Sequence, residues 1–338
     1  MKLSSGDFSR DVPSATGDSR RSLLLKLAAL PLAAALPALA QAPWPSKPIR
    51  VVVPSPAGGG TDNMARALTD RMREILGATF VIENRAGATT AIGTEYVSQA
   101  PADGYTLLFA SPPGFTILPH LRPVKYTLEQ FEAIGAIGNV ATMVVARKDL
   151  PVETLSDLIA LAKKSPGKIT FGSPGVGSLG HLAGEVFTRQ AGIEVLHVPF
   201  NGSAPLVTAA LGGQVDYIVN DAAVAYIKEG RLKGLAMFVD KPLPGLPQVP
   251  TIRQAGMDAL VPSTPMGLLA PKGTPRLILE KLTAAVQRAM QDPALTDRLP
   301  GFSVPPQYMG PDEFMRLLVQ ARDAFGAVIR DKGIKENG

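Results

Sequence analysis

Residues 49–66, IRVVVPSPAGGGTDNMAR, combine a strand, a glycine loop and a helix start in a way that suits an anion-binding site. The β-branched run at residues 49–53 predicts a strand, and the loop after it is expected to comprise Pro56, Ala57, Gly58, Gly59 and Gly60. Thr61 or Asp62 is expected to cap a helix whose apolar residues recur at Met64, Leu68, Met72 and Ile75. A helix that begins there aims unpaired backbone N–H groups at whatever lies beyond the strand. Such donors favour a small anionic group such as a carboxylate.

The glycine loop does not match the known phosphate-binding loops. A nucleotide-cradling loop needs Lys-Ser or Lys-Thr where this chain has Thr61-Asp62, and the G-x-G-x-x-G pattern of dinucleotide sites is absent. Asp62 would also repel a multiply charged phosphate, whereas it is tolerated beside one small carboxylate. The motif alone leaves a second interpretation open, in which the glycines only form a tight turn between a closely packed strand and helix.

The first forty residues have the order of an export signal. The pair Arg20-Arg21 precedes an apolar Leu/Ala run, and Ala38-Leu39-Ala40 fits an A-x-A cleavage site before Gln41. The paired arginines resemble the twin-arginine signal, although a general secretory signal can also carry two arginines. A membrane anchor is disfavoured because prolines interrupt an apolar run shorter than about 20 residues. We therefore expect residues 1–40 to be a signal peptide that is removed on export.

Composition excludes several kinds of site. The chain contains no cysteine, so disulfides, thiolate metal sites and a cysteine nucleophile are excluded. Its 34 basic residues face 29 acidic ones without a basic stripe, so no nucleic-acid partner is expected. The histidines show no metal-ligand spacing, and neither a metal nor a cofactor is expected. Removal of the signal leaves about 300 residues, a length that predicts two domains.

Strands and helices alternate along the rest of the chain, with short Gly/Ser-rich junctions. Helices are expected at residues 91–100 and 155–164, between Ser178 and Gly192, before Gly212-Gly213, and from Thr274-Pro275 and Pro311 onward. Strands are expected at residues 79–83, 105–110, 169–172, 194–199, 215–219 and 266–270, and residues 133–147 form a long extended stretch. This alternation predicts a mostly parallel, doubly wound α/β architecture, in which ligands collect at the carboxyl ends of the strands.

A series of segments, in order along the chain, resembles one protein family. They are VVVPSPAGGGTDNMAR, VIENRAG, ADGYTLLFA, GSPGVGSLGHLAGEVF, HVPFNGSAP, LGGQVDYIV, IKEGRLKGLA, VPTIRQAG and GLLAPKGTP. They resemble the substrate-binding receptors of the tripartite tricarboxylate transporters, often called Bug receptors. The resemblance covers essentially the whole chain after residue 40.

The resemblance implies an α/β fold of the periplasmic binding protein type II-like class, with two doubly wound α/β domains joined by two crossing strands. Residues 41–142 plus 267–338 would form domain 1 and residues 143–266 domain 2, with crossings near residues 140–146 and 264–268. The implied protein is a periplasmic, non-enzymatic receptor, expected to be a monomer. It would capture a small organic acid between its domains and deliver this ligand to the membrane permease subunits of a tripartite transporter.

The resemblance also implies binding residues in both domains. The loop from Pro56 to Asp62 would hold a carboxylate, mainly through backbone N–H groups, and Ser111 would face the ligand from the third strand end. The opposing wall in domain 2 would consist of Ser173, Gly177, Ser178, His181, Asn201 and Gly202. Asn220 or Asp221 could meet an amino or hydroxyl group of the ligand.

Three positions depart from the family pattern and bear on which acid fits. Thr89-Thr90 stands where the family often has two glycines, residues 222–225 are more apolar than usual, and Pro265-Met266 replaces a frequent tryptophan. The family binds dicarboxylates, tricarboxylates, acidic amino acids and aromatic acids. The apolar substitutions favour a less polar acid.

Side chains that suggest catalysis have simpler interpretations. His181, near a helix start, is expected to support its loop more than to contact ligand, and Arg85 is expected to tie its loop to Glu83. Ser178 lies one residue off the G-x-S-x-G pattern, so a periplasmic hydrolase is disfavoured. A ligand-sensing adaptor for a signalling system stays open, because it would use the same closed surface as a transport receptor.

Overall fold

The computed structural model describes residues 44–257 and 264–335 of the chain. The predicted export signal and its cleavage site lie outside the described residues. Within them the strands form two five-stranded sheets, and we call each sheet with its helices a lobe. No helix in the described ranges is both long and apolar enough to cross a lipid bilayer.

Lobe 1 is built on a mixed sheet with the strand order β2-β1-β3-β10-β4. Its strands are β1 (Ile49–Val53), β2 (Phe80–Asn84), β3 (Thr106–Ala110), β4 (Phe131–Asn139) and β10 (Pro265–Pro271). Strand β1 pairs parallel with β2 and β3, whereas β10 runs antiparallel between β3 and β4.

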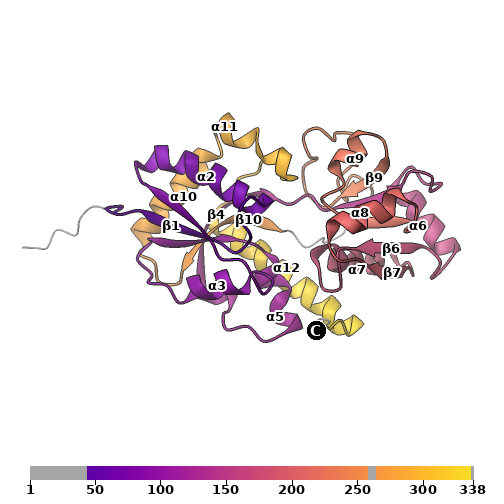
Figure 1. The fold of residues 1–338 in the computed structure, drawn as a ribbon, viewed down its shortest axis with the longest axis horizontal. Coiled ribbons are helices and arrows are strands. Elements are labelled where there is room, and N and C mark those ends of the chain that lie inside the picture. The colour runs from indigo at the N-terminus through magenta and orange to yellow at the C-terminus, as the bar shows by residue number, and fades with distance from the viewer. Residues whose placement is uncertain (1–43, 258–263, 336–338) are drawn as a thin grey trace, which may run out of the picture. The chain divides into compact units, whose positions relative to one another are not determined.

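The helices of lobe 1 cover both faces of this sheet. They are α2 (Gly60–Leu76), α3 (Ala91–Ser98), α4 (Pro113–Thr116), α5 (Leu118–Leu121), α10 (Arg276–Ala289), α11 (Pro293–Thr296) and α12 (Pro311–Lys332), with short 3₁₀ turns η1 (Leu128–Gln130) and η2 (Leu299–Phe302). Helices α2 and α10 pack against each other on one face, and α3 lies on the other (Figure 1). The helical period predicted for α2 is confirmed, because Met64, Leu68 and Met72 are all buried.

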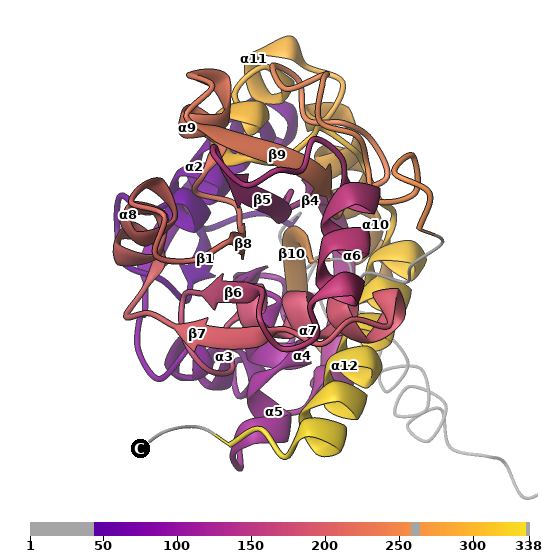
Figure 2. The ribbon, with the colours of Figure 1, turned by 90° about the vertical axis from the view of Figure 1, so that its right-hand side faces the viewer.

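Lobe 2 is built on a second mixed sheet with the order β7-β6-β8-β5-β9. Its strands are β5 (Met143–Arg147), β6 (Thr170–Ser173), β7 (Leu196–Pro199), β8 (Tyr217–Asn220) and β9 (Leu232–Met237). Its helices are α6 (Leu155–Lys164), α7 (Leu179–Ala191), α8 (Ser203–Leu211) and α9 (Val224–Lys228). Figure 2 shows α6 and α7 on one side of the strands and α8 and α9 on the other, each pair closing its own apolar core.

Three differences between the observed elements and the sequence prediction concern the strands. The long extended stretch at residues 133–147 divides into β4 and β5, which belong to different sheets. Strand β9 was not expected, because Lys233 and Gly234 weaken its strand signal. Strand β10 in lobe 1 and strand β5 in lobe 2 run antiparallel to their neighbours, so both sheets are mixed. The strands that lead into the predicted binding loops are parallel to one another: β1 with β2 and β3, and β6 with β7 and β8.

The two lobes are joined where β4 passes into β5 and where the chain returns to β10. The two connecting segments lie side by side, because Val140 donates its N–H to the carbonyl of Thr264 at 3.3 Å and Asn139 pairs with Pro265. The adjacent Ala141 donates to the carbonyl of Ser303 at 2.7 Å. The predicted domain boundaries at residues 142/143 and 266/267 fall at or next to these segments and remain predictions.

Helix α12 contacts both lobes. Phe314 and Leu318, in its first half, belong to the core of lobe 1. Phe325 and Ile329, in its second half, form an apolar cluster with residues of α7, and ion pairs from Glu185 to Lys332 and from Arg189 to Asp331 lie beside it. Helix α12 therefore connects the core of lobe 1 with α7, the helix whose first turn belongs to the predicted site of lobe 2.

Candidate functional site

The glycine loop leads into α2 without a side-chain cap. The helix begins at Gly60 with Gly59 as its N-cap, so the predicted cap by Thr61 or Asp62 is wrong. Gly58 has a φ of +79°, a left-handed conformation that glycine adopts without strain. Because the helix starts before Thr61, the carboxylate of Asp62 lies inside the first turn and reaches back to the loop.

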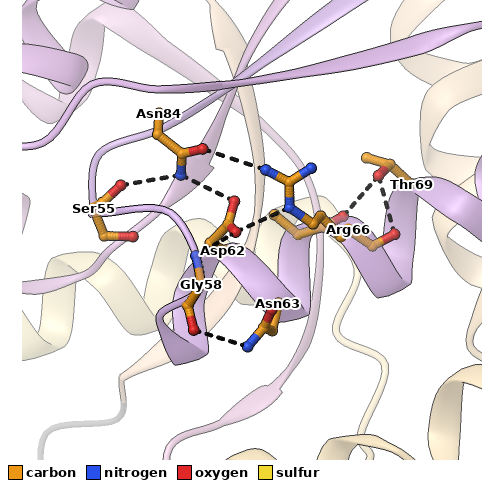
Figure 3. A network of polar contacts seen from close by, with 8 residues as sticks. Ser55, Gly58, Asp62, Asn63, Arg66, Thr69 and Asn84 are labelled. Carbon is orange, nitrogen blue, oxygen red and sulfur yellow. Dashed lines mark hydrogen bonds and ion pairs between the residues drawn. The ribbon is translucent and has the colours of Figure 1, made fainter.

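The Asp62 carboxylate holds the glycine loop in place (Figure 3). Asp62 is 1% exposed, and its carboxylate accepts the backbone N–H of Gly58 at 2.8 Å and Nδ2 of Asn84 at 2.9 Å. Arg66, one helical turn later, donates to it through Nε at 2.9 Å. Burial works against the charge, but these donors outweigh burial and hold the pKa of Asp62 below its ordinary value. The ionised carboxylate thus ties the loop to the end of β2, and its charge is already compensated within the protein.

The backbone amides of the loop remain available to a ligand. The first intrahelical hydrogen bond runs from Asn63 N–H to Gly59 O at 2.9 Å. Among the described residues, no partner accepts from the N–H groups of Ala57, Gly60, Thr61 and Asp62. Pro56, Ala57 and the three glycines are exposed. The loop therefore presents several unpaired donors at the positive end of a helix, which is the arrangement that favours a carboxylate.

Ser111 follows β3 at the same edge of the sheet as the glycine loop. Strands β1 and β3 are parallel neighbours, so their carboxyl ends lie together. Ser111 is partly exposed, and its carbonyl accepts the N–H of Gly114 at 3.1 Å. Ser111 thus lies at the third strand end, and its predicted contact with a ligand remains a prediction.

The loop after β2 carries backbone strain. Ala88, Thr89 and Thr90 have φ angles of 48°, 51° and 74°, in the left-handed region that residues other than glycine seldom adopt and β-branched ones least of all. The Thr90 hydroxyl is buried without a hydrogen-bond partner. The Thr89-Thr90 pair thus occupies backbone conformations that glycine, frequent there in the family, adopts freely. Arg85 pairs with Glu83 at 2.6 Å, as predicted.

The corresponding loop of lobe 2 is held by an uncharged side chain. Ser178 is the N-cap of α7 and its hydroxyl accepts the N–H of His181 at 3.2 Å. Nδ1 of His181 accepts the N–H of Gly177 at 3.1 Å, so the ring carries its proton on Nε2, which lies 3.7 Å from a Glu185 oxygen. Burial, with smaller effects from His197 and Lys332, lowers the pKa of His181 to about 3. Neutral His181 supports the loop, as predicted.

Ser173 lies beneath this loop against a second histidine. Its hydroxyl is 2.6 Å from Nε2 of His197, and the side chain is fully buried. The rings of His197 and His181 stack with centroids 4.0 Å apart. A serine–histidine pair is thus present, but the buried hydroxyl has no surface for a substrate. The contact instead fixes the end of β6, from which the loop departs.

Two further strand ends of lobe 2 meet at the same edge. Gly202 donates its N–H to the carbonyl of Pro174 at 3.0 Å, which joins the loop after β7 to that after β6, and Asn201 is exposed beside it. Asn220 is buried; its amide donates to Ser203 Oγ at 3.0 Å, and its oxygen accepts the N–H of Ala222 at 2.7 Å. Asp221 follows it and is partly exposed.

The structure therefore gathers the predicted residues at one strand edge in each lobe. Within the described part of the chain, no hydrogen bond joins the glycine loop to the loops of lobe 2. Sequence reasoning missed His197, Asn84 and Arg66, which hold the two loops. Arg66 lies one helical turn after Asp62 and could have been found by that spacing, but the other two contacts depend on strand order.

An apolar groove of about 860 Å³ lies elsewhere, between α10, α12 and β4. None of the predicted binding residues lines it. Its rim carries paired charges, including Lys272 with Glu132 and Arg276 with Glu280. The groove is therefore separate from the strand ends.

Comparison with known proteins decides the family. The model of the tripartite tricarboxylate transporter family receptor matches residues 64–334. The chain belongs to this receptor family. BugT of Bordetella pertussis is 32% identical over 299 residues, which cover 86% of this chain and 91% of BugT.

Solved receptors share the fold. An R. palustris protein solved with adipate is 31% identical, with a TM-score of 0.69, and the match covers 86% of this chain and 99% of that protein. MatC from Rhodopseudomonas palustris, solved with bound malate, is 29% identical, with a TM-score of 0.65, and the match covers 85% and 100%. The predicted family and the two-domain, type II-like α/β fold are confirmed. The chain is a solute-binding receptor of the tripartite tricarboxylate family, which is non-enzymatic in general.

Proposed function

We propose that this receptor is exported to the periplasm, captures a small carboxylate between its lobes and delivers it to the permease subunits of a tripartite transporter. The observation that carries the proposal is the exposed set of unpaired amides at the start of α2, among them those of Gly60 and Thr61. Two receptors with the same fold were solved with adipate and malate, both of which are carboxylates.

The ligand would dock first on the glycine loop. Its carboxylate would accept hydrogen bonds from the N–H groups of residues 57 and 60–62, and Ser111 would add a hydroxyl from the neighbouring strand end. The supporting side chains Asp62, Ser173, His181 and Asn220 act by fixing the backbone, because each is already engaged by protein groups. The parts of the predicted wall that are exposed or partly exposed, such as Asn201, Ser178 and Gly202, are the surfaces of lobe 2 that can approach a docked ligand.

Closure would follow docking. The paired connections near Val140 and Thr264 are the points at which the lobes can rotate, as in hinged binding proteins. Closure would exclude water from the amide–carboxylate hydrogen bonds and so strengthen them. A membrane partner that binds the closed state better than the open one would recognise the loaded receptor.

The docking step is tested by placing a large side chain on the loop. Gly60 has ordinary helical geometry, and a Cβ added there meets no atom within 4 Å, so Gly60→Phe can fold while it covers the free amides. We expect a panel of mono-, di- and tricarboxylates and amino acids to include one that raises the melting temperature of the wild type but not of Gly60→Phe. Gly212→Phe is the control, because its added Cβ meets only ordinary contacts at 3.4 Å or more, on lobe 2.

Two results would reject the docking proposal. One is that no carboxylate of the panel shifts the melting temperature or releases heat in calorimetry. The other is an equal shift in Gly60→Phe, which would place the ligand away from the glycine loop. Delivery is tested separately by uptake of the identified ligand in cells with and without the receptor gene. Unchanged uptake would remove the transport role.

A further inference from the structure

Asp221 lies where the two lobes meet. It follows β8, whose carboxyl end shares an edge with that of its parallel neighbour β6. Its backbone carbonyl accepts the Ser303 hydroxyl at 3.3 Å, and the Ser303 carbonyl accepts the N–H of Ala141 in the connection between the lobes. The main chain of Asp221 is thus anchored to lobe 1 beside the hinge segment. Closure would keep this residue next to the enclosed space.

The neighbouring Asn220 cannot serve the ligand in the same way. Its amide nitrogen donates to Ser203, its oxygen accepts the N–H of Ala222, and the residue is 2% exposed. Both ends of its side chain are therefore occupied by the protein. Of the two residues that the sequence left as alternatives, only Asp221 is partly exposed and has a side chain that no other described residue engages.

Among the described residues, the carboxylate of Asp221 accepts a hydrogen bond only from its own backbone N–H and has no ion-pair partner. Two other acidic groups of lobe 2 are engaged by protein groups: Asp216 pairs with Arg147 and Thr170, and Asp157 caps α6. Asp221 is partly exposed, yet the atoms around it desolvate the carboxylate and raise its pKa. A desolvated charge without a partner destabilises the protein, and such groups concentrate at functional sites.

We propose that Asp221 selects ligands that carry a protonated amine in addition to a carboxylate, so that the receptor takes zwitterionic amino acids. The inference rests on the proposed function, because the glycine loop must hold the ligand carboxylate. The ammonium group then donates to Asp221, and the two charges that closure would bury are paired. A ligand with a second carboxylate in that place would bring two like charges together in a desolvated space. A hydroxyl group donates a hydrogen bond but leaves the Asp221 charge uncompensated.

The test uses acids that share a carbon skeleton and differ at one substituent. Succinate, malate and aspartate form one set, and 3-phenylpropionate, 3-phenyllactate and phenylalanine form another. Calorimetry on the wild type should show that the amino member of at least one set binds about 10-fold or more tighter than its unsubstituted and hydroxy counterparts. Asp221→Asn should lose this preference, with amino-acid affinity about 10- to 100-fold lower and the unsubstituted acid bound no more weakly.

A structural role for Asp221 predicts the opposite stability result. Because Asp221→Asn removes an unpaired desolvated charge, the ligand-free variant should melt at the same temperature as the wild type or higher. A merely structural carboxylate would lower the melting temperature when replaced. Asp240→Asn, at an exposed position of lobe 2, removes one charge without touching the site and should leave the preference unchanged.

The outcomes separate this inference from the proposed function. If carboxylates bind the wild type and fail to bind Gly60→Phe, yet the unsubstituted or hydroxy member is preferred, the capture role stands and the Asp221 inference is overturned. The same holds if Asp221→Asn keeps a preference for the amino member. If no member of either set, and no acid of the wider panel, binds the wild type, both proposals fail.

Discussion

The two glycine loops that lead into helices, one in each lobe, are held by chemically opposite side chains. The loop before α2 is fixed by an ionised carboxylate, Asp62, with Arg66 and Asn84 around it. The loop before α7 is fixed by a neutral imidazole, His181, together with the hydroxyl of Ser178. At both helix starts some backbone N–H groups, such as those of Gly60 and Leu179, have no acceptor among the described residues, so a charged or an uncharged side chain can hold such a loop.

Backbone strain also distinguishes the two lobes. Near the strand ends of lobe 2, the left-handed positions are glycines, among them Gly175, Gly177 and Gly202. In lobe 1 the loop after β2 places Ala88, Thr89 and Thr90 in that region. Lobe 1 therefore stores strain next to its predicted carboxylate site, whereas lobe 2 does not.

Removal of the charged support should have the largest effect. In Asp62→Ala the Gly58 N–H and the Asn84 amide lose their buried acceptor, and we expect the free energy of unfolding to fall by about 2–4 kcal/mol. Urea denaturation measures this loss. Asp70→Ala, in the same helix but half exposed, should cost no more than about 0.5 kcal/mol. Equal losses in the two variants would show that the carboxylate does not hold the loop.

Acid should weaken the histidine support of the lobe 2 loop before the Asp62 support of the lobe 1 loop. His181 has an ordinary pKa of 6.5 and a folded-state pKa of about 3, so below pH 6.5 the unfolded chain binds a proton that the folded chain does not. Stability therefore falls with pH by up to about 1.4 kcal/mol per unit from this residue, and His197, whose pKa burial also lowers, acts in the same direction. The Asp62 contribution is complete above its ordinary pKa of 3.8 and is lost only below that pH.

Denaturation of the wild type and of His181→Phe between pH 7 and 4.5 checks this order. Because the variant has no group to protonate at this position, its stability should fall less steeply, and the two curves should converge as the pH drops. Glu185 and Lys332, which face the ring, are unchanged in the comparison. Parallel curves would contradict the prediction.

At pH 7, replacement of the neutral support His181 should lower the free energy of unfolding less than replacement of the charged support Asp62. In His181→Phe the Gly177 N–H loses its acceptor while an aromatic ring remains to stack on His197, and we expect a loss of about 1–2 kcal/mol. Ser178→Ala is the matched control, because it removes the cap of the same helix and leaves the ring in place. We expect it to lower the free energy of unfolding by about 1 kcal/mol. If His181→Phe is as stable as the wild type, Ser178 alone holds the loop and the prediction is wrong.

Relief of backbone strain in lobe 1 should change the free energy of unfolding least, and it should raise it. Thr90→Gly removes a β-branched residue from φ 74°, and after the entropy of glycine in the unfolded chain is counted we expect a gain of about 0.5–1 kcal/mol. The reciprocal change in lobe 2, Gly202→Ala, places a side chain at φ +103° with no atom within 4 Å, and should lose about 1–3 kcal/mol. Thermal unfolding compares the two. A loss in Thr90→Gly would mean that the threonine side chain stabilises the loop by more than its backbone costs.

Much of the fold could be predicted from local sequence. The predicted helix at residues 155–164 is α6 (Leu155–Lys164), and Pro311 begins α12 as expected. Gly192 ends α7, again as predicted, and the structure shows it in a left-handed conformation. These features depend on periodicity, proline and glycine within a few residues, which is why the sequence reveals them.

The features that the sequence did not predict depend on contacts between distant segments of the chain. Strand β10 inserts antiparallel between β3 and β4, and nothing in its local sequence indicates its neighbours. The cap of α2 was assigned to Thr61 or Asp62 because both are good capping residues, whereas the structure engages Asp62 with Asn84 on β2. His197 gave no signal at all, because its partner Ser173 comes from the adjacent strand.

The sequence by itself determined where the chain can expose backbone amides, since glycine and helix starts are local properties of the polypeptide. Only the tertiary structure decided which polar side chains are engaged by other protein groups and which are not. Asp62, His181 and Asn220 bind other residues, while the Asp221 carboxylate, among the described residues, has only its own backbone N–H. The physical reason is that a hydrogen bond requires its donor and acceptor within about 3 Å, and strand order sets which groups come that close.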